Sequence, residues 1–324
     1  GAKEAVREKT IREPSLWLKM SGVILVLIGI ISIATFKRSS TKLQTSSYYL
    51  SGKPLTRGIP NSVIFTYDAV SSPSDSIYIQ QSWDKRKRVL VEKNRHTHTS
   101  IYYEPGFFKA KLLVDSQIVK EQSLIIPTDG WLGLIEQKAV PVYLEQAEFT
   151  TRNYIHLPST SITKNNITLQ PIPPVVKFYN VGNFRPTEIH NFSFNVDVKN
   201  DLAAGSAACQ LTNVILITDD NPIIIPLSTK GCSSELSLLS VDQIISGKKN
   251  DLSGFGADLK NWVNITVKAS PNGLHYFVND QLAYECPLPK RKMYIVGMAY
   301  VFQGTGAVKN ILLEGENGIA FKAF

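Results

Sequence analysis

The pattern of apolar and polar positions divides the chain into one long apolar run and many short alternating ones. Met20 to Phe36 is seventeen residues without a charge or a proline, and the segment lengthened to Leu16 has 21 residues. At about 1.5 Å rise per residue, a helix of that length crosses a hydrocarbon layer of about 30 Å. The run therefore predicts a transmembrane helix over 16–36 that contacts the lipid bilayer. The alternatives are a buried core helix, which would show a polar stripe, and a cleaved signal peptide, which would show a cleavage site of small residues.

The segments on either side of this run differ from it in composition. Residues 1–15 are mainly polar and charged, and we expect a short cytoplasmic segment there. Residues 37–58 are rich in Ser, Thr, Lys and Gly, a composition typical of a flexible tether.

Short runs with a period of two begin near residue 59. Phe108, Ala110, Leu112 and Val114 alternate with more polar neighbours, so they predict one face of a strand directed into a core. Similar β-branched and aromatic runs, separated by turn residues, continue to residue 128. The pattern predicts a small β-sandwich over 59–128.

Residues 102–112 have the spacing Y-x-x-P-G-x-F-x-A-x-L, with Tyr102, Pro105, Gly106 and Phe108 at its defining positions. This spacing resembles the signature of PKD domains. The resemblance implies an immunoglobulin-like sandwich that acts as an extracytoplasmic spacer or interaction module, with no catalytic residue. The W-D-F-G-D-G turn of the family is absent, because Trp83 and the following Asp run into four basic residues.

A second β-rich region follows a connecting segment at 129–160. Phe192, Phe194, Val196 and Val198 alternate with polar residues, which predicts an antiparallel strand with one buried face. Many such strands and almost no helical period predict a jelly roll of two packed sheets over 161–324.

Residues 262–285 begin with a Trp-led strand, continue through a P-N-G turn and reach Y-F-V-N-D. Residues 304–313 begin with a turn of small residues that leads into a closing strand. This arrangement resembles laminin-G-like and concanavalin-like domains, a group that contains lectins, protein-binding modules and glycoside hydrolases. Asp280 stands where the family usually has Gly. The fold class expected for the whole ectodomain is all-β, with an immunoglobulin-like sandwich followed by a concanavalin-like jelly roll.

Charge is distributed unevenly along the chain. The net charge is +8, of which residues 1–57 carry +7. The basic character therefore belongs to the flanks of the apolar run, and we expect no nucleic-acid partner. Residues 84–98 form a local basic segment with His96 and His98, interpreted as a solvated hairpin loop; an edge that contacts anions is the alternative.

The three cysteines predict one disulfide. A hairpin closing about Asp220 and Asn221 pairs positions whose numbers sum to 441, and Cys209 and Cys232 meet that condition. Directly opposed residues lie at a separation that a disulfide spans. Two buried free thiols are the alternative, and Cys286 remains as a buried free thiol in either case. Because disulfides persist outside the reducing cytoplasm, the C-terminal domains are expected to be extracytoplasmic, in the periplasm or on the cell surface.

The second region contains the residues that could support catalysis, metal binding or an aromatic platform. Its carboxylates are Asp197, Asp201, Asp219, Asp220, Glu235, Asp242, Asp251, Asp258 and Glu285. They do not form the clustered strand motif of hydrolases with this fold, so no catalytic residue, metal site or cofactor is expected. The turn at 219–221 is interpreted as a plain turn rather than a calcium site. Trp262 is assigned to the core, and the candidate exposed aromatic residues are Tyr179, Phe184, Tyr300 and Phe302.

These observations predict a single-pass membrane-anchored binding protein, not an enzyme. It would recognise glycan through a lectin-like jelly roll carried on a PKD-like spacer. One alternative is a protein–protein interaction subunit of a membrane or cell-envelope assembly, and a second is a glycoside hydrolase with a jelly-roll catalytic domain. Sequence assigns no individual binding residue.

Overall fold

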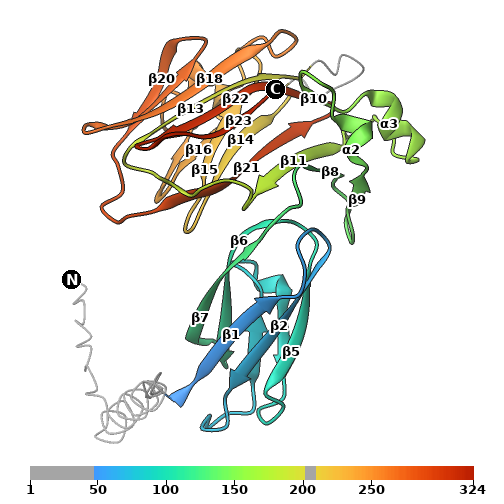
Figure 1. The fold of residues 1–324 in the computed structure, drawn as a ribbon, viewed down its shortest axis with the longest axis vertical. Coiled ribbons are helices and arrows are strands. Elements are labelled where there is room, and N and C mark those ends of the chain that lie inside the picture. Colours follow the sequence, from blue (N-terminus) through green and yellow to red (C-terminus); the bar gives the residue numbers. More distant parts are fainter. Residues whose placement is uncertain (1–46, 201–208) are drawn as a thin grey trace, which may run out of the picture. The chain divides into compact units, whose positions relative to one another are not determined.

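The computed structural model describes residues 47–200 and 209–324, which belong to one compact unit (Figure 1). The predicted transmembrane helix over 16–36 lies outside the described residues. Within the described ranges, no helix combines the length and the apolar character that crossing a bilayer requires. The described fold is all-β, as predicted, with two short helices, α2 (Gln146–Phe149) and α3 (Ser159–Lys164).

The N-terminal strands form a small sandwich of two antiparallel sheets, one in the order β1-β2-β5 and the other in the order β4-β3-β6-β7. Their bounds are β1 (Tyr49–Pro54), β2 (Asn61–Asp68), β3 (Ile77–Gln80), β4 (Arg88–Val91), β5 (Thr97–Tyr102), β6 (Gly106–Val114) and β7 (Gln117–Ile126). A 3-10 helix, η2 (Lys85–Lys87), joins β3 to β4.

Alternation along these strands produces the core of the small sandwich. Val63 and Phe65 in β2 are fully buried between exposed or half-buried neighbours. In β6, Ala110, Leu112 and Val114 are buried as predicted, while Phe108 is half-buried.

The tether expected over 37–58 is corrected by β1. Its residues pair with β2 from Tyr49 opposite Asp68 to Pro54 opposite Val63. Leu50 in β1 is buried, so this strand belongs to the sandwich. The Ser, Thr and Gly content of the segment is typical of a tether and did not predict this strand. Pairing with β2 and burial of Leu50 stabilise it.

The remaining strands form a larger sandwich of a nine-stranded and a seven-stranded sheet (Figure 1). The nine-stranded sheet contains β8 (Leu132–Ile135), β9 (Val142–Leu144), β11 (Val175–Val181), β12 (Thr187–Glu188), β14 (Thr212–Thr218), β15 (Ile223–Leu227), β16 (Ser237–Ser240), β17 (Gln243–Ser246) and β21 (Tyr294–Gln303). The seven-stranded sheet contains β10 (Ile155–His156), β13 (Phe192–Lys199), β18 (Val263–Ser270), β19 (Gly273–Val278), β20 (Gln281–Cys286), β22 (Ala307–Gly315) and β23 (Gly318–Ala323). Two 3-10 helices, η3 (Ser233–Glu235) and η4 (Ser253–Phe255), lie in the connections.

The core of the larger sandwich lies between these two sheets. The predicted row in β13, Phe192, Phe194, Val196 and Val198, is buried, and every intervening residue is partly exposed. From the nine-stranded sheet, Phe178 and its neighbours contribute to the same apolar cluster. Each sheet therefore directs a second set of side chains away from the core.

The connecting segment expected over 129–160 is also corrected, because it contributes strands to the larger sandwich. Ile135 in β8 pairs with Val176 in β11, and Ile155 in β10 pairs with Val308 in β22. Its strands are only two to four residues long. Such short runs show too little period to be recognised in sequence.

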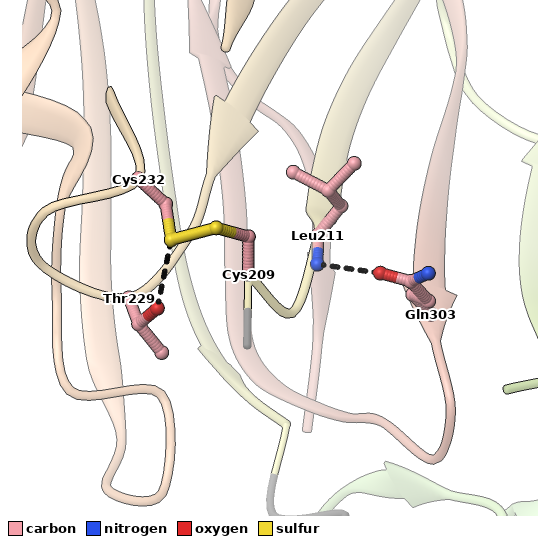
Figure 2. Close-up of a disulfide and its surroundings, with 5 residues drawn as sticks. All are labelled: Cys209, Leu211, Thr229, Cys232 and Gln303. Atoms are coloured by element: carbon pink, nitrogen blue, oxygen red, sulfur yellow. Dashed lines mark hydrogen bonds between the residues drawn. A yellow bond between two sulfur atoms is a disulfide. The ribbon is translucent and has the colours of Figure 1, made fainter. Parts of the chain in front are cut away.

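The predicted disulfide between Cys209 and Cys232 is confirmed, although the predicted register was wrong (Figure 2). Paired positions in β14 and β15 sum to 439, as in Thr212 opposite Leu227, and the ladder ends there. A turn then follows in which the Cys232 N–H donates to the Thr229 carbonyl at 3.2 Å. This turn brings Cys232 to Cys209 with a Cα separation of 5.6 Å. Chain reversal after the strand, rather than cross-strand pairing, forms the bridge.

The small sandwich contacts the outer face of the nine-stranded sheet. Phe107 of β6 packs against an apolar cluster on that face that includes Tyr179 and Ile217. The Tyr143 hydroxyl donates to the Tyr103 carbonyl at 2.8 Å. These contacts occupy part of the outer face of the nine-stranded sheet.

Candidate functional site

The outer face of the seven-stranded sheet carries a row of polar side chains. Asn195 and Asp197 in β13 lie opposite Thr266 and Asn264 in β18. All four point away from the core because the residues between them are buried. Polar side chains that gather on one sheet face form a surface suited to a hydrophilic ligand.

Hydrogen bonds fix the centre of this row. Both carboxylate oxygens of Asp197 accept amide donors, from Asn264 Nδ2 at 2.7 Å and from Asn310 Nδ2 at 2.6 Å. Asn195 Nδ2 donates to Thr266 Oγ1 at 2.8 Å. The side chains are therefore held in place before any ligand arrives.

Asn310 reaches this row through a bulge in β22. Lys309 pairs with Asp197, whereas Leu312 pairs with Asn195, so β22 contains one extra residue at this point. Asn310 has a φ of 52°, a left-handed conformation that Asn adopts more readily than most residues. The bulge directs the Asn310 amide toward the carboxylate of Asp197.

Trp262 lies at one end of the same face, which corrects its assignment to the core. Its side chain is partly exposed and is not a member of the core cluster. The Lys309 ammonium lies 4.3 Å from the ring centroid, within the range of a cation–π contact. The Tyr154 ring packs edge-on at 6.4 Å, and Tyr154 in turn lies 6.3 Å from the His156 ring. We call the set of Trp262, Tyr154, Lys309, Asp197, Asn264 and Asn310 the Trp262 face.

The Trp262 face combines groups that bind carbohydrate. Aromatic rings attract the C–H faces of sugars, and fixed amide and carboxylate groups bind hydroxyls. The Lys309 ammonium adds a donor beside the Trp262 ring. A sugar hydroxyl or carboxylate that binds Lys309 would therefore lie next to an aromatic surface.

The four aromatic residues that the sequence left as candidates for an exposed platform lie elsewhere. Tyr300 and Phe302 are fully buried, and Tyr179 is 7% exposed. Phe184 is partly buried and packs on Phe321 with a ring-centroid separation of 5.3 Å. None of these four contributes to the Trp262 face.

The Asp219–Asn221 segment is a turn held by cations and hydrogen bonds. Asp220 binds Lys109 and Arg291, and Arg291 also binds Asp242. Asp219 Oδ1 accepts the backbone N–H of Tyr294 at 2.9 Å. Among the described residues no group of three or more His, Cys, Asp or Glu side chains is placed to hold a metal ion. Asp219 and Asp220 therefore already have hydrogen-bond or ion-pair partners within the protein.

Arg291 keeps two of the candidate carboxylates ionised. Burial opposes ionisation of Asp220, but Lys109 and Arg291 outweigh it and hold its pKa below the ordinary value. The hydrogen bond from Arg291 likewise lowers the pKa of Asp242. A general acid in glycoside hydrolysis needs a raised pKa, so neither carboxyl suits that role.

The remaining candidate carboxylates are not part of the Trp262 face and lie in turns, in η3, next to a histidine or outside the described residues. Asp251 and Asp258 accept backbone N–H groups two residues ahead, from Ser253 and Lys260. Glu285 lies 3.3 Å from the His275 ring. Glu235 lies in η3, and Asp201 lies outside the described residues.

Cys286 is a buried free thiol, as predicted, whereas the basic segment at 84–98 is not a single hairpin loop, because it contains η2, β4 and the first residues of β5. Cys286 is a free, buried cysteine at 3% exposure, and burial raises the pKa of its thiol. In the 84–98 segment, the three residues of η2 are exposed. His98 has a pKa lowered by burial and by Arg95.

The Trp262 face was not predicted because a Trp that leads a strand resembles a core residue. The signal was present in the strand period. Trp262 shares the phase of Asn264 and Thr266, and Val263 shares the phase of the buried Ile265. Position in the alternation, rather than residue type, predicts the exposed face.

Solved structures with distant likeness to this chain include carbohydrate-active proteins. A carbohydrate-binding module from Bacillus subtilis is 10% identical with a TM-score of 0.31, over 44% of this chain and 86% of that chain. An alginate lyase is 10% identical with a TM-score of 0.31, over 57% and 89%. A glycosyl hydrolase family protein from Mycobacterium fortuitum is 9% identical with a TM-score of 0.25, over 82% and 92%. Likeness at these TM-scores does not decide function.

Comparison at the level of sequence adds no family. No protein-family model matches the chain, and a search of curated proteins finds no match. The class that the fold and the site define is therefore an all-β protein with a polar and aromatic sheet face.

Proposed function

We propose that the protein binds glycan through the Trp262 face of the larger sandwich. The observation that carries this proposal is the partly exposed Trp262 ring beside a row of hydrogen-bonded polar side chains. Asp197 is held by two amide donors, and Lys309 lies over the ring. A fixed polar row keeps the entropic cost of ordering side chains on binding low.

The finer architecture belongs to the same proposal. The larger sandwich would be a jelly roll of the laminin-G-like or concanavalin-like type, and the small sandwich a PKD-like spacer that presents it. The contacts of Phe107 and Tyr103 with the nine-stranded sheet support a spacer that docks on the face away from the glycan site.

We also propose that residues 16–36 anchor the chain in a membrane, with the β-rich part outside the cytoplasm. The uninterrupted apolar run supports the anchor. The Cys209–Cys232 disulfide supports the orientation, because such bonds persist in oxidising compartments. Carbonate extraction and protease accessibility of intact cells would test both statements.

Binding without cleavage is the third part of the proposal. Arg291 favours the ionised form of both Asp220 and Asp242, which argues against an acid and base pair at this position. The Asp197 carboxylate uses both oxygens as acceptors for side-chain amides. A carboxylate fixed in this way suits recognition better than nucleophilic attack.

A glycan array with the 324-residue chain, purified in detergent, tests the function. Wild type is expected to bind a subset of glycans, and Trp262→Ala is expected to lose that binding. The matched control is Ile244→Ala, which removes another exposed apolar side chain, 77% exposed, from β17. Retained binding by Trp262→Ala would contradict the site.

Two further results would redirect the function. If wild type binds no glycan, the result would favour the alternative in which the chain is a protein–protein interaction subunit. If the bound glycans release reducing sugar over time, and replacement of a carboxylate abolishes the release, the glycoside hydrolase alternative replaces simple binding.

A further inference from the structure

Trp83, in the connection between β3 and η2, has the largest exposed fraction, 83%, of any large apolar side chain in the described ranges. The turn that presents it is fixed. Asp84 accepts the backbone N–H of Arg86 at 3.0 Å, and the Arg86 guanidinium binds the same carboxylate. One exposed apolar side chain is ordinary on a protein surface, so its surroundings decide whether it has a role.

Three adjoining hollows surround Trp83 or continue from it. The first, of about 210 Å³, has Trp83, Tyr103 and Lys87 in its wall. The second, of about 590 Å³, shares these residues and adds Lys138. The third, of about 600 Å³, shares Lys138 and ends at Ile172. Because neighbouring hollows share wall residues they form one elongated depression, which we call the Trp83 groove.

The acidic side chains of the Trp83 groove already have cationic partners. Asp84 pairs with Arg86 at 3.0 Å. Glu104 and Glu136 both pair with Lys177, at 3.1 Å and 2.9 Å. Arg86 balances Asp84, but Lys177 carries only one charge against the two glutamates, so these ion pairs leave one negative charge in the groove wall.

The lysines of the groove have no direct partner of this kind, although the Lys87 charge adds to that of Arg86 in lowering the pKa of Asp84. Lys87 and Lys138 are exposed, and neither makes an ion pair with a residue that the structure describes. These two ammonium groups, set against the one unbalanced carboxylate, leave the groove with a net charge of +1 beside an exposed indole. An elongated groove with this chemistry favours a chain-like ligand that carries both flat apolar faces and negative charge.

We propose that the Trp83 groove binds an acidic saccharide chain. One sugar ring stacks its C–H face on the Trp83 indole, and carboxylates on that ring or its neighbours pair with Lys87 and Lys138. The Gln137 side chain, in the wall of the second and third hollows, supplies an amide for hydroxyl groups. The Trp83 groove is then a second binding site, formed by the small sandwich together with the β8–β9 connection of the larger one.

A lipid surface is the main competing ligand, because Trp and basic residues also favour membrane interfaces. The placement of the groove disfavours it. The described chain enters the small sandwich at Tyr49, at one end of the β1–β2 pair, whereas Asn61 at the start of β2 pairs with Tyr102 at the other end. The Tyr102 hydroxyl donates to the Gln81 carbonyl at 3.0 Å, which places Trp83 near that other end. The groove therefore lies away from the point at which the chain arrives.

Calorimetry with the 324-residue chain in detergent tests the proposal. The probes are alginate and polygalacturonate oligosaccharides, with laminarin oligosaccharides of equal length as the uncharged comparison. Wild type is expected to bind at least one uronate chain more tightly than laminarin, and the affinity is expected to fall as salt rises. Trp83→Ala should weaken that binding at least tenfold, and the double variant Lys87→Gln/Lys138→Gln should weaken it and flatten its salt dependence. Ile244→Ala should change neither.

The Trp83 groove contains no residue of the seven-stranded sheet, so Trp83→Ala and Trp262→Ala report on separate sites. Uronate binding that survives Trp83→Ala, or no uronate binding by wild type, would overturn the proposal. So would Trp83-dependent binding to vesicles of phosphatidylserine and phosphatidylcholine without any uronate binding. Thermal unfolding of each variant near the wild-type midpoint is expected, because an exposed side chain contributes little to stability.

Discussion

The Lys177 ammonium lies 3.1 Å from Oε1 of Glu104, which joins β11 of the nine-stranded sheet to the β5–β6 connection of the small sandwich. The Tyr179 hydroxyl donates to the other oxygen of Glu104 at 2.6 Å. Burial works against the charge of Lys177, but Glu104 and Glu136 outweigh it and raise the pKa of the ammonium. Burial and the Glu104 charge also raise the pKa of the Tyr179 phenol. Glu104 is therefore the shared acceptor of the contact between the sandwiches.

Replacing Glu104 should weaken this contact. Glu104→Ala leaves the Tyr179 hydroxyl without its acceptor and Lys177 with Glu136 alone, so we expect a loss of about 1–2 kcal/mol in the free energy of unfolding. The matched control is Glu136→Gln, whose carboxylate is 49% exposed and which should cost less than about 0.5 kcal/mol. Denaturant unfolding measures both. Equal effects of the two variants would contradict the central role of Glu104.

The disulfide should stabilise the larger sandwich. Cys209 and Cys232 are 23 positions apart, and closing a loop of this size restricts the unfolded chain by about 3 kcal/mol. Cys209→Ser/Cys232→Ser should therefore unfold at a lower temperature, and reductant should shift wild type but not the variant. The control is Cys286→Ser, whose response to reductant should equal that of wild type because its thiol is free. A non-reduced digest in which all three cysteines are alkylated would contradict the bridge.

The sequence predicted long strands better than short ones, because a long strand shows more repeats of the apolar–polar alternation. The β13 row from Phe192 to Val198 spans a full strand, and its alternation predicted the buried face. By contrast β8 and β10 are four and two residues long, and their place in the sheets follows from pairing with β11 and β22. Pairing partners distant in sequence leave no local period.

The cysteine bridge shows that a contact can be predicted without its geometry. The turn residues after β14 indicated a hairpin, but its ladder closes at Leu216 opposite Ile223, two positions away from the predicted register. The turn after β15 nevertheless brings Cys232 back to Cys209, so the bridge forms despite the two-position change in register. Hydrogen bonds in both turns fixed the register, and residue types alone do not specify them.

The candidate site was less predictable than the fold. Asn310 enters the Trp262 face only through a bulge, and the sequence shows no extra residue until the partner strand is known. For Trp83 the sequence indicates only that the turn typical of PKD domains is missing there. Its exposure depends on the Asp84 turn and on the neighbouring 136–141 segment, which lines the second hollow.

Two glycines allow backbone strain and steric conflict to be separated. Gly273 has a φ of 144°, and a Cβ there would lie 2.3 Å from the Cys286 carbonyl oxygen. Gly58 has a φ of 91°, but a Cβ there meets nothing within 4 Å. Gly58→Ala should cost about 1 kcal/mol through conformation alone, and Gly273→Ala should cost clearly more. Thermal unfolding of the two variants gives the comparison, and equal losses would contradict the predicted conflict at Cys286.

The Asp220 ion network should make stability depend on pH. Lys109 and Arg291 hold the folded-state pKa of Asp220 below its unfolded value of about 3.9. Since the folded pKa is depressed, the ionised carboxylate stabilises the fold above the unfolded pKa, and this contribution is lost as the pH falls through the folded pKa. The Asp220 side chain is 17% exposed, so solvent screens its ion pairs only in part and most of their stabilisation remains.

Asp220→Asn tests this dependence because the amide does not titrate. At pH 6 the variant should be less stable than wild type by about 1–2 kcal/mol, and the difference should shrink as the pH falls from about 4 toward 2. Asp242→Asn is the matched control: its carboxylate binds the same Arg291 but is 47% exposed, so the difference at pH 6 should be smaller. Chemical denaturation across this range measures the difference. If the gap between wild type and Asp220→Asn stays constant down to pH 2, the ionised carboxylate is not its source.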